Sequence, residues 1–196
     1  MLLTNPQPYL IDYRTLAQAA QEARGGIDSC ILHWTAGRYN QVFDDYHLSL
    51  DKTGNLYAPT PDFTEVLEHT WHRNQGTLGI ALCCALGARP NNGYDTDFGS
   101  QPPSTTQIET LSCVVNILSQ NLELPITSET FMTHCEAALQ DGYGPFSGDS
   151  QTRWDLWYLP DWPARQGALF PGGEVIRAKA LWYQAHSSNN GLEVKL

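Results

Sequence analysis

Basic residues are scarce in this chain. Its 196 residues include 11 Lys and Arg against 21 Asp and Glu, which gives a formal net charge of −10. A generally basic surface is the usual electrostatic footprint of proteins that bind nucleic acid or anionic lipid. We therefore predict no nucleic-acid partner, and we expect any anionic ligand to be held by a local positive feature, such as a metal ion or a single Arg.

Long apolar runs are also lacking. Residues 1–16 contain Pro6, Pro8 and Asp12, where a signal peptide would need a charged start followed by a long apolar segment. No stretch approaches the roughly 20 apolar residues that a spanning helix requires. We expect no membrane span and a chain made in the cytoplasm without a signal peptide, so that another carrier must bring it to any target outside the cytoplasm.

Two common zinc motifs are absent. The five cysteines form no CxxC pair, and no HExxH sequence occurs, which argues against a cysteine-only zinc site and against the common helical zinc-peptidase motif. Low-complexity segments and internal repeats are lacking too. With 41% hydrophobic residues, the chain can bury one substantial core, and we predict a single domain over residues 1–196.

Strand and helix patterns alternate along the chain. The clearest helix is predicted at 105–122, where apolar residues recur at three- and four-residue intervals behind a Ser/Thr cap region. Further helices are predicted at 12–24 and 174–186, strands at 28–34, 45–50, 55–58, 77–85 and 131–134, and long loops at 87–103 and 141–152. This alternation predicts an α/β fold, a single domain with a central mixed β-sheet flanked by helices.

Two of the six histidines share a setting. His33 and His134 each follow a short apolar strand and precede a predicted turn. Strand ends are where α/β proteins assemble their sites. Two such histidines and one carboxylate would make the three-ligand, open site of a catalytic zinc ion.

Several motifs occur in a fixed order around these histidines: Ile31-Leu32-His33-Trp34-Thr35-Ala36-Gly37, then Tyr46-His47 with the hairpin that ends at Tyr57, then Trp71-His72 with Asn74 and Thr77-Leu78-Gly79-Ile80, and last Thr133-His134. Together they resemble the amidase-2 family, which contains phage-lysozyme-type amidases, bacterial muramoyl-alanine amidases and peptidoglycan recognition proteins. The resemblance covers about residues 28–160 as the core of the domain.

The resemblance implies one zinc ion per chain, with His33 and His134 as its first two ligands. The third ligand departs from the family pattern, because the usual Asp-Pro-Gly is absent and the interval after His134 is long. Asp155 matches best, since a basic residue, Arg153, lies two positions ahead of it. The alternatives are Cys135, Asp141 and Asp149.

The resemblance also assigns catalytic roles. Arg153 takes the place of the family's catalytic basic residue and, as an always-protonated group, would stabilise an oxyanion. Tyr46 corresponds to a tyrosine that orients or deprotonates the reacting water, and we predict it as the general base, because the Glu of many bacterial members is replaced here by Ala81. The predicted substrate-binding residues are Trp34, Trp71, His72 and Asn74, whereas His47 is expected to be structural.

These residues predict an N-acetylmuramoyl-L-alanine amidase, which cleaves the amide bond between N-acetylmuramic acid and the L-alanine of the peptidoglycan stem peptide. The alternative is a peptidoglycan-binding recognition protein without catalysis. The expected setting is the cell wall of a target or host cell, reached as a secreted antibacterial effector or a phage endolysin; a cytoplasmic recycling enzyme is a further possibility. An effector would need an immunity protein as a partner in the producing cell.

Overall fold

The centre of the protein is a mixed sheet of six strands. The computed structural model describes residues 7–91, 95–148, 153–161 and 171–190. In the described part, the sheet has the order β1-β4-β3-β5-β2-β8. Its strands are β1 (Tyr9–Ile11), β2 (Ser29–Trp34), β3 (Leu48–Leu50), β4 (Leu56–Ala58), β5 (Thr77–Leu82) and β8 (Phe131–Thr133).

The middle of the sheet is parallel. Strand β2 pairs in parallel with β5 on one side and with β8 on the other, and Leu32 lies opposite Thr133. The two strands therefore end at the same edge of the sheet. His33 follows Leu32 and His134 follows Thr133, so the register brings both histidines to one place.

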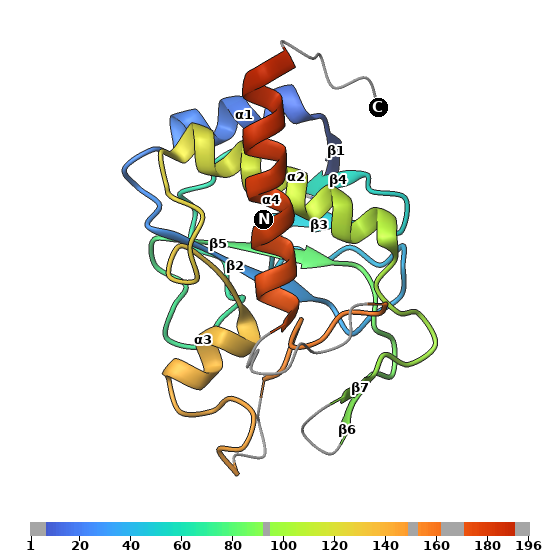
Figure 1. Cartoon of the computed structure of the whole chain (residues 1–196). Helices are drawn as coiled ribbons and strands as arrows, with labels where there is room; N and C mark the ends of the chain where they lie inside the picture. The colour runs from blue at the N-terminus through green and yellow to red at the C-terminus, as the bar shows by residue number, and fades with distance from the viewer. Residues whose placement is uncertain (1–6, 92–94, 149–152, 162–170, 191–196) are drawn as a thin grey trace.

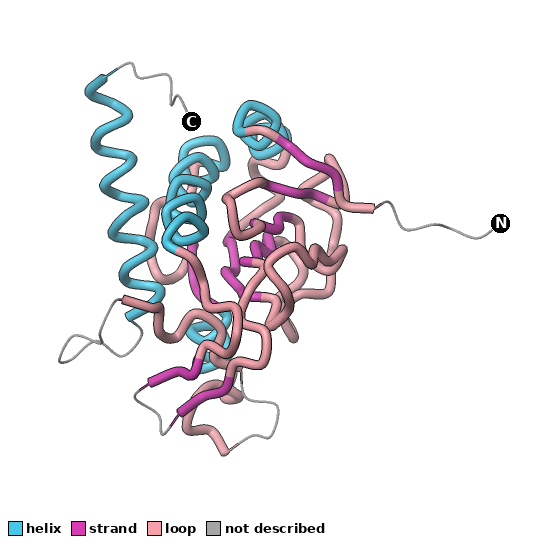
Figure 2. The backbone as a smooth tube through the Cα atoms, turned by 90° about the vertical axis from the view of Figure 1, so that its right-hand side faces the viewer, coloured by secondary structure: helices cyan, strands magenta, loops and turns pink. Residues whose placement is uncertain are grey.

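Helices flank the sheet. They are α1 (Tyr13–Glu22), α2 (Thr105–Leu122), α3 (His134–Gln140) and α4 (Pro171–Asn190). Figure 1 shows α4 crossing in front of α2, which lies in front of the sheet. The turned view in Figure 2 separates these layers into α4, α2 and sheet, and shows loops along the other side.

One large apolar cluster joins these layers. It contains the buried faces of α1 and α2 together with side chains of the sheet strands, among them Leu16, Leu32, Ile80, Leu111 and Val115, each fully buried. Burial of such side chains is the main favourable contribution to folding. The predicted α/β class, with a central mixed sheet and flanking helices, is confirmed.

The predicted helix 105–122 has the boundaries that α2 adopts. The Ser104 hydroxyl accepts a hydrogen bond from the backbone N–H of Gln107, and the side-chain oxygen of Gln107 accepts one from the backbone N–H of Ser104, which forms a capping box. At the other end, Glu123 adopts a left-handed conformation with φ 61°. The predicted helix 12–24 is α1, two residues shorter at its C-terminal end, and the helix predicted at 174–186 is the longer α4.

Three local predictions were wrong. The strand predicted at 45–50 is confined to β3, so Tyr46 and His47 precede it. His134 begins helix α3 and is not followed by a turn. The loop at 87–103 contains a small antiparallel hairpin of β6 (Arg89–Asn91) and β7 (Asp95–Asp97). Of the second predicted loop, residues 149–152 lie outside the described residues.

Among the described residues, no helix is both long and apolar enough to cross a membrane.

Candidate metal centre and cleft

Three buried or half-buried side chains meet at the edge of the sheet. His33, His134 and Asp155 each offer one ligand atom, and these atoms all lie within 4.8 Å of one another. We call this group the His–His–Asp cluster. It is the set of three ligands predicted from the sequence, and it can hold a metal ion.

The spacing of the cluster suits a tetrahedral ion. Oδ2 of Asp155 lies 3.5 Å from Nδ1 of His33 and 3.5 Å from Nδ1 of His134. These separations are long for a hydrogen bond. Ligand atoms about 2.0–2.1 Å from a tetrahedral zinc ion would be roughly 3.3–3.4 Å apart, which is close to the spacing observed.

A polar atom without a partner supports the same reading. Nδ1 of His33 is buried and makes no hydrogen bond among the described residues. Leaving such an atom unpaired costs free energy unless another partner, such as a metal ion, is present. The donor set, two imidazole nitrogens and one carboxylate oxygen, therefore fits a divalent metal ion.

The charge states of the cluster also suit metal binding, which requires neutral imidazole and ionised carboxylate. Burial lowers the pKa of His33 to about 4, although the Asp155 carboxylate opposes this shift. Burial by itself would raise the pKa of Asp155, but His134 and His33 outweigh it and hold that pKa well below its usual value. At neutral pH the cluster thus combines one negative charge with a neutral His33.

The alternatives for the third ligand are placed elsewhere. Asp141 forms a bidentate ion pair with Arg73, at 2.6 and 2.7 Å. Cys135 is buried among Trp157 and Tyr158, and burial raises the pKa of its thiol. Asp149 lies outside the described residues. The structure brings Asp155 to the two histidines.

His134 is held by the start of helix α3. Thr133 accepts a hydrogen bond from the backbone of Glu136, and the Glu136 carboxylate accepts one from the backbone of Thr133. The same carboxylate forms two short hydrogen bonds with Arg177 of α4, at 2.8 and 2.7 Å. The capping box and the Arg177 contact together hold the start of α3, where His134 is the first residue.

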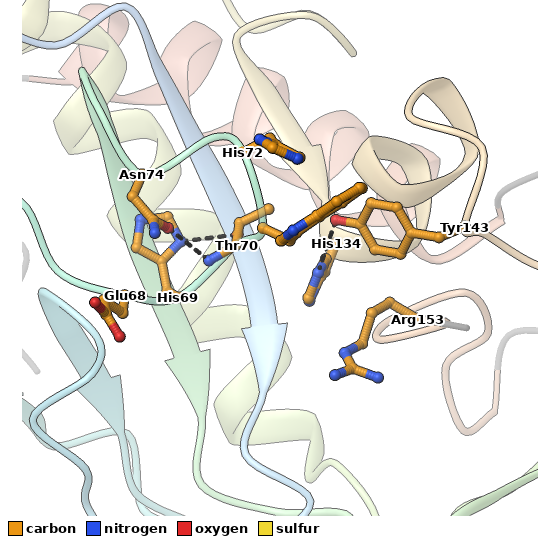
Figure 3. A pocket seen from close by; sticks show the side chains of 9 residues that line it. Glu68, His69, Thr70, His72, Asn74, His134, Tyr143 and Arg153 are labelled. Carbon is orange, nitrogen blue, oxygen red and sulfur yellow. Dashed lines mark hydrogen bonds between the residues drawn. The ribbon is translucent and has the colours of Figure 1, made fainter. Parts of the chain in front are cut away.

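A cleft of about 660 Å³ lies beside the cluster. It is lined by Glu68, His69, Thr70, Trp71, His72, Asn74, His134, Tyr143 and Arg153. Figure 3 shows Tyr143 and Arg153 beside His134 on one side, and Glu68, His69 and Asn74 of the β4–β5 loop on the other. His134 belongs to both the cleft and the cluster, so a ligand in the cleft would reach a metal ion at that residue.

Arg153 lies in this cleft. Its backbone N–H donates to the carbonyl oxygen of Tyr143 at 3.2 Å. Its guanidinium also acts on two phenols. Burial raises the pKa of Tyr46 and of Tyr143, and the charge of Arg153 partly offsets that rise in both. Arg153 thus supplies positive charge close to the His–His–Asp cluster.

Tyr46 lies near the cluster from the other direction. The ring centroids of Tyr46 and His33 are 5.1 Å apart. Burial, followed by the charges of Asp155 and Asp45, raises the pKa of Tyr46 well above its usual value. Its hydroxyl is therefore protonated at neutral pH, which favours a role in orienting water over the predicted role as a general base.

The predicted substrate-binding residues divide into two groups. Trp71, His72 and Asn74 line the cleft. Trp71 is 61% exposed and packs edge-to-face on Tyr143. Trp34 is only 4% exposed and packs against Phe98 and Trp154 within the core. The structure places Trp34 in the core and away from the lining of this cleft.

His47 has the structural role expected of it. It is fully buried, its Nδ1 accepts from the backbone N–H of Gly79 at 3.0 Å, and its Nε2 lies 2.8 Å from the carbonyl oxygen of Glu65. Because Nδ1 accepts, Nε2 carries the proton and donates to Glu65. His47 therefore ties the β4–β5 loop to strand β5.

Sequence reasoning missed two contacts of the histidines in the His–His–Asp cluster. The hydroxyl of Tyr143 lies 3.4 Å from Nε2 of His134, and the hydroxyl of Thr70 lies 3.3 Å from Nε2 of His33. Metal-binding histidines commonly place their second nitrogen on such a partner. No periodic pattern marks either residue, although Thr70 immediately precedes the Trp71-His72 motif.

Comparison with known protein families and with curated proteins gives no match to this chain.

Proposed function

We propose that this protein is a zinc-dependent N-acetylmuramoyl-L-alanine amidase of the amidase-2 type. The observation that carries the proposal is the geometry of the His–His–Asp cluster, in which Nδ1 of His33 and Nδ1 of His134 both face Oδ2 of Asp155 at 3.5 Å beside an open cleft. The order of the motifs around these residues in the sequence supports the same family.

Zinc is the metal that this donor set suits best. Two histidines and one carboxylate are the ligands of many catalytic zinc sites, which keep a fourth position open. A zinc ion held there would act as a Lewis acid that activates water and polarises the amide carbonyl. The site would keep a net positive charge, because only one of the three ligands is anionic.

Arg153 is proposed to stabilise the oxyanion of the reaction by its positive charge. Attack on an amide places negative charge on the carbonyl oxygen, and a fixed positive charge in the cleft stabilises that oxyanion. Arg stays protonated at any relevant pH, so Arg153 does not transfer protons. Tyr46, protonated and next to His33, would orient the attacking water by hydrogen bonding.

The aromatic rim of the cleft fits the proposed substrate. Trp71 and Tyr143 meet edge-to-face with ring centroids 5.3 Å apart, and both line the cleft. Aromatic faces of this kind pack against the apolar faces of sugars and against peptide side chains. We propose that they hold the glycan or the stem peptide next to the metal ion.

The net charge of −10 bears on the biological setting. A strongly acidic surface does not adhere to an anionic cell wall by charge alone. We propose that the protein is an antibacterial effector delivered to the periplasm of a target cell, with an immunity protein that blocks the cleft in the producing cell. A phage endolysin is the second setting.

Digestion of purified peptidoglycan tests the proposed reaction. The zinc-loaded protein should release peptides that begin with L-Ala and leave glycan strands with free lactyl groups, as identified by mass spectrometry. The His134→Ala variant is the matched control and should release none. Binding of peptidoglycan by the zinc-loaded protein without any of these products would favour the alternative, a non-catalytic recognition protein.

A further inference from the structure

A line of hydrogen bonds leads away from the His–His–Asp cluster. Nε2 of His33 lies 3.3 Å from Oγ1 of Thr70, which lies 2.9 Å from Nδ1 of His69. Nε2 of His69 lies 3.3 Å from Oγ1 of Thr77, whose hydroxyl donates to the carbonyl oxygen of Arg73. The four side chains are at most 8% exposed, and Figure 3 shows the link between His69 and Thr70.

The hydrogen bond of Thr77 determines which atoms donate and which accept along this line of hydrogen bonds. A carbonyl oxygen only accepts, so the single hydroxyl proton of Thr77 points to Arg73 and its oxygen accepts from Nε2–H of His69. His69 is 7% exposed and its ring contacts two other histidines. A buried imidazole without an acidic contact is neutral, so His69 carries its one proton on Nε2.

The proton position on His69 in turn determines the donor and acceptor roles at Thr70 and His33. Because Nδ1 of His69 has no proton, it accepts from the hydroxyl of Thr70. The oxygen of Thr70 accepts in turn from Nε2–H of His33. A neutral His33 with its proton on Nε2 presents an unprotonated Nδ1, which is the atom that faces Asp155 at 3.5 Å.

Contacts that do not involve the hydroxyl of Thr70 hold its backbone in place. Its N–H donates to Oδ1 of Asn74 at 2.8 Å. The ring of His69 lies directly over Gly79 of β5, where a Cβ would come within 2.5 Å of Cγ of His69. Because these contacts anchor the loop, its position does not depend on the hydroxyl of Thr70. That hydroxyl can therefore orient His33.

We propose that Thr70 is a positioning residue that fixes the tautomer of His33, with its direction set by His69 and Thr77. The proposal rests on the metal site of the proposed function and needs no assumption about the substrate. The hydroxyl of Thr70 keeps Nδ1 of His33 free of a proton before a metal ion arrives. Metal binding then has no tautomer exchange to drive, which raises the affinity for the ion.

Nitrogen NMR of the metal-free protein tests the tautomer directly. In protein labelled with ¹⁵N-histidine, the shifts of His33, assigned with the His33→Gln variant, should show a protonated Nε2 and an unprotonated Nδ1. Thr70→Val, which keeps the side-chain shape, should give the mixed shifts of a histidine that exchanges between tautomers. A proton on Nδ1 of His33 in the wild-type protein would overturn the proposal, whatever the variants do.

Zinc affinity, measured by competition with a chelator, gives the second readout. Thr70→Val should bind zinc roughly 10–100-fold more weakly, as is usual when the outer partner of a ligand is lost, and Thr70→Ser should recover most of that affinity. Thr60→Val is the matched control, because Thr60 is also buried and its hydroxyl accepts from the backbone of Asp62 away from the cleft. Equal affinities in Thr70→Val and the wild type would overturn the proposal.

The experiments distinguish failure of the amidase reaction from failure of the role of Thr70. If peptidoglycan stays intact in the digestion while the zinc affinities of the Thr70 variants are as expected, the amidase reaction is overturned and the role of Thr70 stands. A wild-type protein that binds no zinc would overturn the metal site and the role of Thr70 with it.

Discussion

The guanidinium of Arg177 holds both carboxylate oxygens of Glu136, at 2.8 and 2.7 Å, inside the protein. Arg177 also donates to the carbonyl oxygen of Phe131 at 3.0 Å. The Glu136 carboxylate caps the start of helix α3, where His134 is the first residue. One buried ion pair thus links helix α4 to the strand and the helix that present His134 to the His–His–Asp cluster.

Arg177→Met should destabilise the fold because it leaves the Glu136 carboxylate buried without its partner. Removal of one member of a buried pair typically costs about 3–5 kcal/mol, which urea unfolding would measure. Adding Glu136→Gln should recover part of the loss. Lys179→Met, which removes the half-exposed ion pair of α4 with Glu109, is the control and should cost about 1 kcal/mol or less. Equal losses in the two single variants would contradict this role for the buried pair.

Metal content separates the three ligands from their neighbours. His33→Ala, His134→Ala and Asp155→Asn should each lose zinc, because a site with two ligands holds the ion far more weakly. Asp141→Asn should retain one zinc per chain, since Asp141 pairs with Arg73 and lies outside the cluster. Elemental analysis of the purified proteins measures the zinc content of each variant. Full zinc in Asp155→Asn would show that another group is the third ligand.

Arg153 should affect turnover and leave metal content unchanged. If its charge stabilises the oxyanion, Arg153→Ala should lose roughly 10²–10³ in kcat, the usual cost of one such group. KM should change much less, because the interaction strengthens only in the transition state. Arg153→Lys should recover part of the rate. Near-wild-type turnover in Arg153→Ala, with zinc content verified, would rule out the electrostatic role.

Acid should destabilise the metal-free protein. Burial lowers the pKa of His33 to about 4 and that of His69 to about 2, from an unfolded value near 6.5. Between these values the unfolded chain binds protons that the folded chain does not, so stability falls as the pH drops below about 6.5. Asp155, whose pKa is held below its usual value, adds a loss of the same sign at lower pH.

Thermal unfolding in the presence of a chelator measures this dependence. The melting temperature should fall steadily from pH 7 to pH 4. His69→Gln should show a shallower slope, whereas His186→Gln should match the wild-type slope, because His186 is exposed. A melting temperature that stays constant between pH 7 and pH 4.5 would contradict the burial of neutral histidines.

The sequence predicts most where a local rule acts alone. Helix α2 follows from its apolar periodicity and its capping box, both of which are visible as residue types. Helix α3 could also have been found, because Thr133 and Glu136 form the same capping pattern. Its short length hid it, since seven residues carry too little periodicity to be recognised.

Tertiary contacts limit what the sequence predicts about the site. Trp34 shares the motif of His33, yet the alternation of a strand turns it into the core against Phe98 and Trp154. Tyr143 and Thr70 reach the histidines of the His–His–Asp cluster only through the fold of two loops. Asp155 was assigned from a family resemblance, in which the basic residue two positions ahead, Arg153, distinguishes it from Asp141.

The position of β2 between β5 and β8 governs when the site comes into existence during synthesis. His33 leaves the ribosome early, but the strands that flank it and the two other ligands follow much later in the chain. At about 5–20 residues per second, Asp155 is added on the order of ten seconds after His33. A nascent chain therefore lacks the complete His–His–Asp cluster for most of its synthesis, and a ribosome-bound fragment that ends before Asp155 has only two of the three side chains that could hold a metal ion.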